Sequence, residues 1–251
     1  MKQVYTTPGG TVYNLYVDAL EQPHLLIAGA TGSGKSVVIN GLIYTMLHRQ
    51  PGGTSGAQMI LIDPKRVELV QWRYTPHCVL YASEPDTMLS ALFRAMDICE
   101  ARYQHMQRNG VRKYGGPDLY VIVDEFADLM TTQGKTVKPL VQRLAQIGRA
   151  ARVHLIIATQ TPIAKVIPTE IKCNFDSRFG LRSRSAQDSR NIIGRAGLED
   201  LPRYGQAVYM TPAGDELYNV PMIPDTDVDQ MANWWKVQRR KHSLLRRLFC
   251  R

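Results

Sequence analysis

An eight-residue stretch carries the clearest chemical signal in the sequence. It matches the pattern G-x-x-x-x-G-K-[ST], follows the apolar run His24–Ala28 and opens Lys35–Arg49, a run long enough for a helix. Its glycines allow the backbone to wrap closely around a phosphate, and successive amides at a helix start attract anions. Lys35 would contact the β- and γ-phosphates, and the Ser36 hydroxyl would ligate Mg²⁺. Rather than a chance glycine-rich turn, we expect an ATP-binding loop formed by Gly29, Ala30, Thr31, Gly32, Ser33, Gly34, Lys35 and Ser36.

Two carboxylates follow the apolar run Leu119–Val123. In a phosphate-loop protein, Asp124 at this place would lie near the metal ion, directly or through a water. The adjacent Glu125 would polarise a water for in-line attack on the γ-phosphate, which is general-base chemistry. The alternative is that Asp124 only caps the next helix while Glu125 is solvated. Hydrolysis, as opposed to binding alone, depends on Glu125.

A polar residue follows the next apolar run, Val153–Ala158. Gln160 would face the γ-phosphate there, where it would orient the attacking water or detect the phosphate. Alternatively, Thr159 and Gln160 only begin a turn before Pro162. The order of phosphate loop, acidic pair and polar residue is that of RecA-like NTPases with an additional catalytic glutamate.

Short apolar runs alternate with helical stretches between these motifs. This alternation predicts an α/β fold of RecA-like P-loop NTPase type, with a mainly parallel central sheet and helices on both faces. The expected strands are His24–Ala28, Met59–Ile62, Cys78–Tyr81, Leu119–Val123 and Val153–Ala158, and the expected helices are Lys35–Arg49, Pro85–Arg108 and Val137–Ala150. Beyond Gln160 a looser pattern extends the sheet, with helices at Pro168–Cys173 and Ala186–Ile193 and strands at Phe175–Leu181, Ala207–Met210 and Glu216–Val220.

The chain divides into three parts. Residues 1–20 are expected to form a hairpin or lead-in around Pro8–Gly10, residues 21–224 the ATPase domain, and residues 225–251 a basic C-terminal helix or tail. The tail holds seven Lys/Arg from Lys236 onward and no acid, so most of the net charge of +9 lies there. The tail would lie on DNA, an anionic membrane surface or a partner, or be a solvated helix held by Trp234 and Trp235.

Composition excludes several protein classes. With 44% hydrophobic and 21% charged residues, the 251-residue chain is neither disordered nor a disulfide-stapled mini-protein. Its four cysteines are scattered, which argues against a zinc site. No apolar stretch approaches the length of a membrane span or a signal peptide. We therefore expect a cytoplasmic protein with no integral membrane segment.

Longer stretches around the motifs resemble the motor domain of the FtsK/SpoIIIE family of double-stranded DNA translocases. The resemblance covers roughly residues 12–224, and the combination of DEFADLM with the later GRAA and ATQ is more specific than the loop alone. The matching stretches are His24–Gly29, Leu61–Lys65, Val123–Met130, Leu144–Ala151, His154–Gln160, Ile171–Phe175, Arg178 and Asp188–Arg190.

The resemblance implies an ATP- and Mg²⁺-dependent motor that assembles as a ring, expected to be a hexamer, on double-stranded DNA. It assigns phosphate and metal contacts to Lys35 and Ser36, and the metal-associated and catalytic acids to Asp124 and Glu125. Arg149 would reach the nucleotide of the neighbouring subunit, although a cation at a helix end is also favoured by the helix dipole. Lys172 and Arg190 match positions that touch DNA phosphates, although either could be a plain surface charge.

Two positions depart from the family pattern. Thr161 stands where the family usually has arginine, and Ala186 stands where a basic residue is common. Both changes reduce the number of positive charges expected to face DNA. The sequence suggests a stripped motor of a mobile element or phage, with a relaxase or another mobile-element protein as partner. The alternatives are a conjugative coupling or DNA-packaging ATPase, and a nucleotide-switched adaptor with little turnover.

Overall fold

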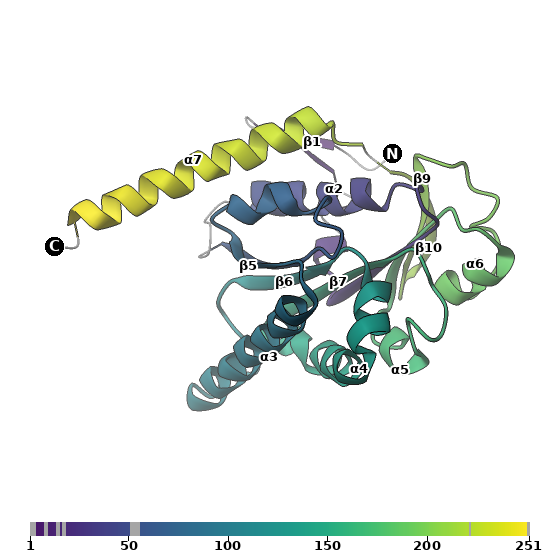
Figure 1. Ribbon diagram of the computed structural model, residues 1–251, viewed down its shortest axis with the longest axis horizontal. Coiled ribbons are helices and arrows are strands. Elements are labelled where there is room, and N and C mark those ends of the chain that lie inside the picture. The colour runs from purple at the N-terminus through teal and green to yellow at the C-terminus, as the bar shows by residue number, and fades with distance from the viewer. Residues whose placement is uncertain are drawn as a thin grey trace.

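An eight-stranded sheet forms the centre of the protein (Figure 1). The computed structural model describes residues 4–7, 10–13, 16, 19–50, 56–220 and 222–249. The strand order in the sheet is β10-β9-β8-β3-β7-β6-β4-β5. The bounds of these strands are β3 His24–Ala28, β4 Ala57–Ile62, β5 Cys78–Ala82, β6 Asp118–Val123, β7 Val153–Thr159, β8 Ser177–Leu181, β9 Gln206–Thr211 and β10 Gly214–Asn219.

Six of the strands are parallel, and β9 and β10 extend the sheet in the antiparallel sense. The central strands β3 and β6 are buried at every position, as expected for strands covered on both faces. β3 lies between β7 and β8, so the carboxyl ends of β3, β7 and β6 are neighbours at one edge. Ligands of open parallel sheets bind at this edge, where the chain leaves a strand for opposite sides of the sheet.

Helices cover both faces of the sheet (Figure 1). On one face, α2 (Lys35–Arg49), η2 (Val70–Tyr74) and α7 (Asp225–Phe249) contribute to one buried apolar cluster. On the other face, α3 (Pro85–Arg108), α4 (Phe126–Ala151) and α5 (Thr169–Lys172) contribute to a second. The short α6 (Ala186–Ile193) packs beside β8. The α/β fold and the mainly parallel sheet predicted from the sequence are confirmed.

The helix expected at Val137–Ala150 is longer than predicted, because α4 begins at Phe126. Its first part contains Thr131, Thr132 and a glycine, which are poor helix formers. The two threonine hydroxyls donate to the carbonyls of the preceding turn, and Gln133 leaves the helical conformation, where the helix kinks. The expected strand and helix bounds elsewhere agree with the structure to within a few residues.

The two ends of the chain form further elements. β1 (Val4–Thr7) and β2 (Gly10–Tyr13) pair antiparallel as a hairpin, and the expected turn residues Pro8 and Gly9 lie outside the described residues. In α7, Trp235 is 8% exposed and packs edge-on against His77, whereas Trp234 is 54% exposed. The side chains beyond residue 237 are outside the described part. No helix in the described ranges combines the length and apolar character needed to cross a bilayer.

Candidate nucleotide site

The phosphate-binding loop, Gly29–Ser36, leaves the carboxyl end of β3 and enters α2. Two of its glycines, Gly32 and Gly34, have φ angles of +70° and +100°, which side chains other than glycine rarely adopt. The loop start is tied to both neighbouring strands, since Gly29 N donates to Thr159 O at 3.4 Å and Ala30 N to Arg182 O at 2.8 Å. The backbone therefore has the form of a cradle for an anion at a helix start.

Lys35 lies across this cradle. Its Nζ donates to the carbonyls of Gly29 and Ala30 at 2.8 and 2.9 Å, and the residue is only 6% exposed. Burial lowers the pKa of Lys35 to about 8, although the negative charge of Glu125 works in the other direction. A phosphate would be a stronger partner for this ammonium than two neutral carbonyls, so the position suits the predicted role.

Glu125 is buried beside the loop and held from three directions. Its carboxylate accepts from Thr159 Oγ1 at 2.9 Å and from the Gln160 amide at 3.2 and 3.3 Å. Lys65 Nζ, from the turn that follows β4, lies 3.5 Å from the other carboxylate oxygen. The end of β6 is thus joined to the end of β7, and the carboxylate has a fixed direction. A base that orients a water needs such a fixed carboxylate.

Asp124 is the carboxylate with the clearest need for a cation. It is 6% exposed, and burial together with the charges of Glu68 and Asp63 raises its pKa to about 7. Its oxygens and the Ser36 hydroxyl are hard ligands of the kind Mg²⁺ prefers. No group of three or more His, Cys, Asp or Glu in the described ranges could hold a metal. A Mg²⁺ ion would therefore take its other ligands from nucleotide phosphates and water.

The Gln160 side chain contacts the phosphate-binding loop. Thr31 Oγ1 donates to Gln160 Oε1 at 2.7 Å, and Arg184 Nη2 lies 3.3 Å from the same hydroxyl. The structure thus brings together the loop, the acidic pair and Gln160. The sequence analysis assigns no role to two residues that contact Glu125: Thr159, which directly precedes Gln160, and Lys65, which ends the matching stretch Leu61–Lys65.

Arg149 lies far from its own phosphate loop. It is exposed in the last turn of α4, which leads into the amino end of β7, whereas the loop is at the carboxyl ends of the strands. Near it, Arg152 forms an ion pair with the buried Asp118, and His154 Nε2 is 2.9 Å from the same carboxylate. Arg149 therefore cannot serve the nucleotide of its own chain, which is compatible with a role in a neighbouring one.

The two predicted DNA contacts lie close to each other. Lys172, at the end of α5, donates from Nζ to the carbonyl of Asn191 in α6 at 3.3 Å. Arg190, the preceding residue of α6, is exposed. The hydrogen bond joins α5 to α6, the helix that carries Arg190.

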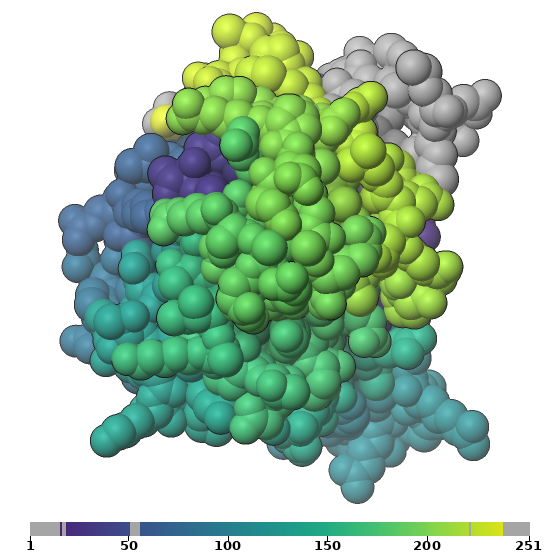
Figure 2. Space-filling view, turned by 90° about the vertical axis from the view of Figure 1, so that its right-hand side faces the viewer, coloured from purple at the N-terminus to yellow at the C-terminus, as the bar shows by residue number. Residues whose placement is uncertain are grey.

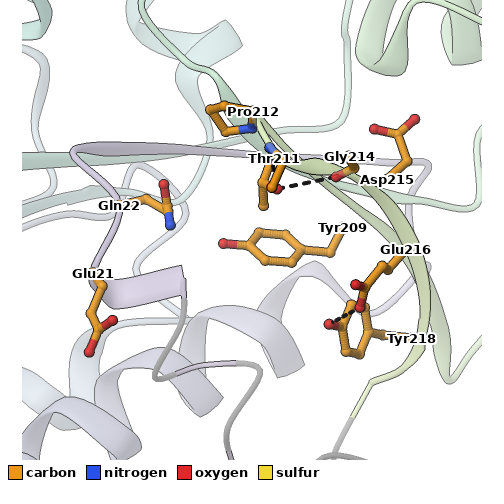
Figure 3. A pocket seen from close by; sticks show the side chains of 10 residues that line it. Glu21, Gln22, Tyr209, Thr211, Pro212, Gly214, Asp215, Glu216 and Tyr218 are labelled. Carbon is orange, nitrogen blue, oxygen red and sulfur yellow. Dashed lines mark hydrogen bonds between the residues drawn. The ribbon is translucent and has the colours of Figure 1, made fainter.

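A separate pocket lies at the opposite edge of the sheet from the loop (Figure 3). The β9–β10 turn and the residues before β3 line it, with the ring of Tyr209 between Gln22 and Glu216. Glu216 accepts a hydrogen bond from Tyr218, and Asp215 pairs with Arg195. None of the site residues predicted from the sequence lines this pocket.

Comparisons with known proteins show the family of this chain. The model of the FtsK/SpoIIIE family matches residues 7–118 and 115–164. The DNA translocase FtsK of Rhizobium meliloti (strain 1021) is 34% identical over 270 residues, covering 90% of this chain and 30% of the relative. The DNA translocase FtsK of Caulobacter vibrioides (strain ATCC 19089 / CIP 103742 / CB 15) is 34% identical over 276 residues, covering 92% and 33%. The chain thus spans about a third of the length of these relatives.

A solved structure shares the fold. The structure of the pCW3 conjugation coupling protein TcpA, in its monomer form with ATPγS, superimposes with a TM-score of 0.76 at 24% sequence identity. The match covers 95% of this chain and 72% of that one. The phosphate loop, the acids at the end of β6 and the match to the family model lead to one conclusion: this chain belongs to the FtsK/SpoIIIE family and has the fold of a P-loop ATPase.

Proposed function

We propose that the chain is the ATP-driven motor of a double-stranded DNA translocase. The observation that carries the proposal is the buried Glu125 carboxylate, held by Thr159 and the Gln160 amide beside the phosphate loop. A domain that only holds nucleotide has no need of a fixed base there. Membership of the FtsK/SpoIIIE family and similarity to proteins named DNA translocase FtsK support the choice of DNA as substrate.

The proposed chemistry is hydrolysis of Mg-ATP. Lys35 and the loop amides bind the phosphates. Ser36 and Asp124 would hold the metal ion, which would stabilise negative charge on the phosphates. Glu125 takes the proton of the attacking water, and Gln160 orients that water or detects the γ-phosphate. Thr31 already links Gln160 to the loop through a 2.7 Å hydrogen bond, so a change at the phosphate would be transmitted to β7.

The working form is a homo-oligomeric ring, which we expect to be a hexamer. Arg149 would complete the site of the neighbouring subunit, because it lies exposed at the edge of the sheet opposite its own loop. An arginine supplied in trans raises phosphoryl-transfer rates by ~10³–10⁵. Lys172 and Arg190 would contact DNA phosphates, which carry no sequence information and so permit stepping along any duplex.

The setting we propose is the cytoplasm, on the DNA of a mobile element or phage. The partner would be a relaxase or another protein of the element. A second candidate, conjugative DNA coupling, is favoured by one observation: the fold superimposes over 95% of this chain on a protein named as a conjugation coupling protein. Both functions use the same site and differ in what the motor delivers DNA to.

The test is turnover and movement on duplex DNA. We expect ATP hydrolysis to rise several-fold with duplex DNA, to increase with duplex length, and to displace a third strand bound to the duplex. Glu125→Gln should abolish both activities, and Glu100→Gln, an exposed change on α3, should abolish neither. Slow turnover that is indifferent to DNA length would instead identify a nucleotide-switched adaptor.

The ring is tested by mixing subunits. Arg149→Ala alone should lack DNA-stimulated hydrolysis although it binds ATP normally. Mixed with Lys35→Ala, which cannot bind ATP, it should regain activity, because an Arg149 from one subunit would complete the intact loop of the next. Absence of any rescue would show that Arg149 does not act between subunits.

A further inference from the structure

Arg184 is a cation beside the phosphate loop, and the proposed hydrolysis gives it no role. Arg184 follows β8, whose end packs directly on the loop: a Cβ on Gly29 would lie 2.7 Å from Leu181 Cβ. The Ala30 amide donates to the Arg182 carbonyl at 2.8 Å, and Ser183 N donates to Leu198 O at 3.1 Å. The backbone on which Arg184 stands is therefore fixed relative to the loop. Figure 2 looks onto this side of the molecule, where purple atoms of the early chain lie next to the green segments that follow β7.

The guanidinium of Arg184 shares one hydroxyl with Gln160. Arg184 Nη2 lies 3.3 Å from Thr31 Oγ1, and that hydroxyl donates to Gln160 Oε1 at 2.7 Å. The charge of Arg184 also reaches Lys35, whose pKa is lowered chiefly by burial and further by Lys65 and Arg184. Arg184 thus belongs electrostatically to the nucleotide site.

Arg184 forms no ion pair among the described residues. Asp188 lines the same small hollow as Arg184. The group of Asp188 that forms a hydrogen bond there is its backbone amide, which donates to Ser185 Oγ at 3.1 Å. A guanidinium bound only to a neutral hydroxyl, at the rim of an anion cradle, is free to take a phosphate as its partner. Guanidinium groups bind phosphate oxygens in a bidentate manner, which makes this exchange favourable.

We infer that Arg184 binds the γ-phosphate of ATP from within the same chain that supplies the loop. This inference rests on the proposed use of ATP. We assign Arg184 to the terminal phosphate because Thr31 accepts a hydrogen bond from Arg184 and donates one to Gln160, which follows β7. The Gln160 amide also holds Glu125, the proposed base for attack on that phosphate. Arg184 therefore contacts the same hydroxyl as the Gln160 side chain, and the Gln160 amide in turn holds Glu125.

Arg184 also connects the nucleotide to the candidate DNA contacts. The next residue, Ser185, caps α6 by accepting from the Asp188 amide, and α6 carries Arg190. The carbonyl of Asn191 in the same helix accepts from Lys172. Movement of Arg184 from Thr31 to a phosphate would act directly on the first turn of α6. Binding of the γ-phosphate would thereby change the positions of Lys172 on α5 and Arg190 on α6.

Equilibrium binding without turnover tests the inference. The dissociation constants of a non-hydrolysable ATP analogue and of ADP are measured for the wild-type protein and for Arg184→Gln. A hydrogen bond to a charged group contributes about 1.5–3 kcal/mol, so the triphosphate should bind about 10–100-fold more weakly and ADP within about twofold of wild type. Arg184→Lys, which keeps the charge without the forked geometry, should lie between the two.

The matched control is Arg195→Gln, which removes one positive charge from the segment after α6, where Arg195 pairs with Asp215. It should change neither affinity. As a second readout, the triphosphate analogue should slow amide hydrogen exchange in α6 of the wild type but not of Arg184→Gln.

Equal loss of both nucleotides, or no loss of either, would overturn the role of Arg184. The proposed function fails separately, if Lys35→Ala still binds both nucleotides normally.

Discussion

The ion pair that ends α4 offers a quantitative test of how the fold holds Arg149. Asp118, 9% exposed at the side chain, accepts from Arg152 Nε and Nη2 at 2.7 and 2.5 Å and lies 2.9 Å from His154 Nε2. Arg152 has a left-handed backbone, with φ of +55°, which is unfavourable for a residue other than glycine. The pair thus stabilises a strained turn three residues beyond Arg149.

We expect Asp118→Asn to lower the free energy of unfolding by about 3 kcal/mol at pH 7. Breaking a buried ion pair by changing one partner costs about 3–5 kcal/mol, and the Arg152 side chain, at 33% exposure, places this pair at the lower end. For a domain of this size the loss corresponds to roughly 6–12 °C in Tm. Urea unfolding followed by circular dichroism measures it. The exposed Asp176→Asn at the same edge of the sheet, whose carboxylate forms no ion pair within the described residues, is the control.

The pH dependence of this difference has a definite sign. Burial opposes ionisation of Asp118, but hydrogen bonds from His154 and Arg152 outweigh it and hold its pKa well below the usual range. A carboxyl with a lower pKa in the folded state stabilises fully above its unfolded pKa of about 3.9, and the stabilisation declines as the pH falls. The gap between wild type and Asp118→Asn should therefore narrow from pH 5 to pH 3. Equal stabilities at pH 7, or a gap that widens in acid, would refute this reasoning.

Two further predictions concern the loop and the C-terminal helix. Burial lowers the pKa of Lys35 to about 8, so the free protein loses this charge above pH 8. The affinity for ATP should therefore fall above pH 8, and ATP binding should take up a proton. Calorimetry in two buffers measures both effects, and an affinity that stays constant from pH 7 to 9.5 would contradict this prediction. Trp235→Ala should raise the rate of trypsin cleavage within α7 on the order of 100-fold, because burying a tryptophan contributes about 3 kcal/mol or more to the packing of the helix. Trp234→Ala, at an exposed position, should leave the rate unchanged. Equal rates for the two variants would show that Trp235 does not hold the helix.

The loop and the acids could be predicted from the sequence because local patterns define them. Strands buried on both faces appear as apolar runs, and the polar residue that follows such a run stands at the carboxyl edge of the sheet. This pattern singles out Glu125 and Gln160 in the sequence, and in the structure the Gln160 amide donates to Glu125.

Other contacts depend on strand order, which no local pattern contains. Arg184 reaches Thr31 because β8 lies beside β3, although the two residues are 153 positions apart. Lys65 contacts Glu125 because β4 is the neighbour of β6. The first part of α4 was missed for a different reason: Thr131 and Thr132 have low helix propensity, and their hydroxyls are satisfied by carbonyls of the helix itself.

The central claim is that Glu125 activates the water that attacks ATP, and single-turnover hydrolysis by Glu125→Gln tests it most directly. The amide can still accept from Thr159 and from the Gln160 backbone, so the site should keep its shape. We predict that the hydrolysis rate falls by about 10²–10⁴-fold while the affinity for a non-hydrolysable ATP analogue stays within a few-fold of wild type. A rate near that of the wild type would contradict the account, and so would a loss of rate explained by a loss of binding.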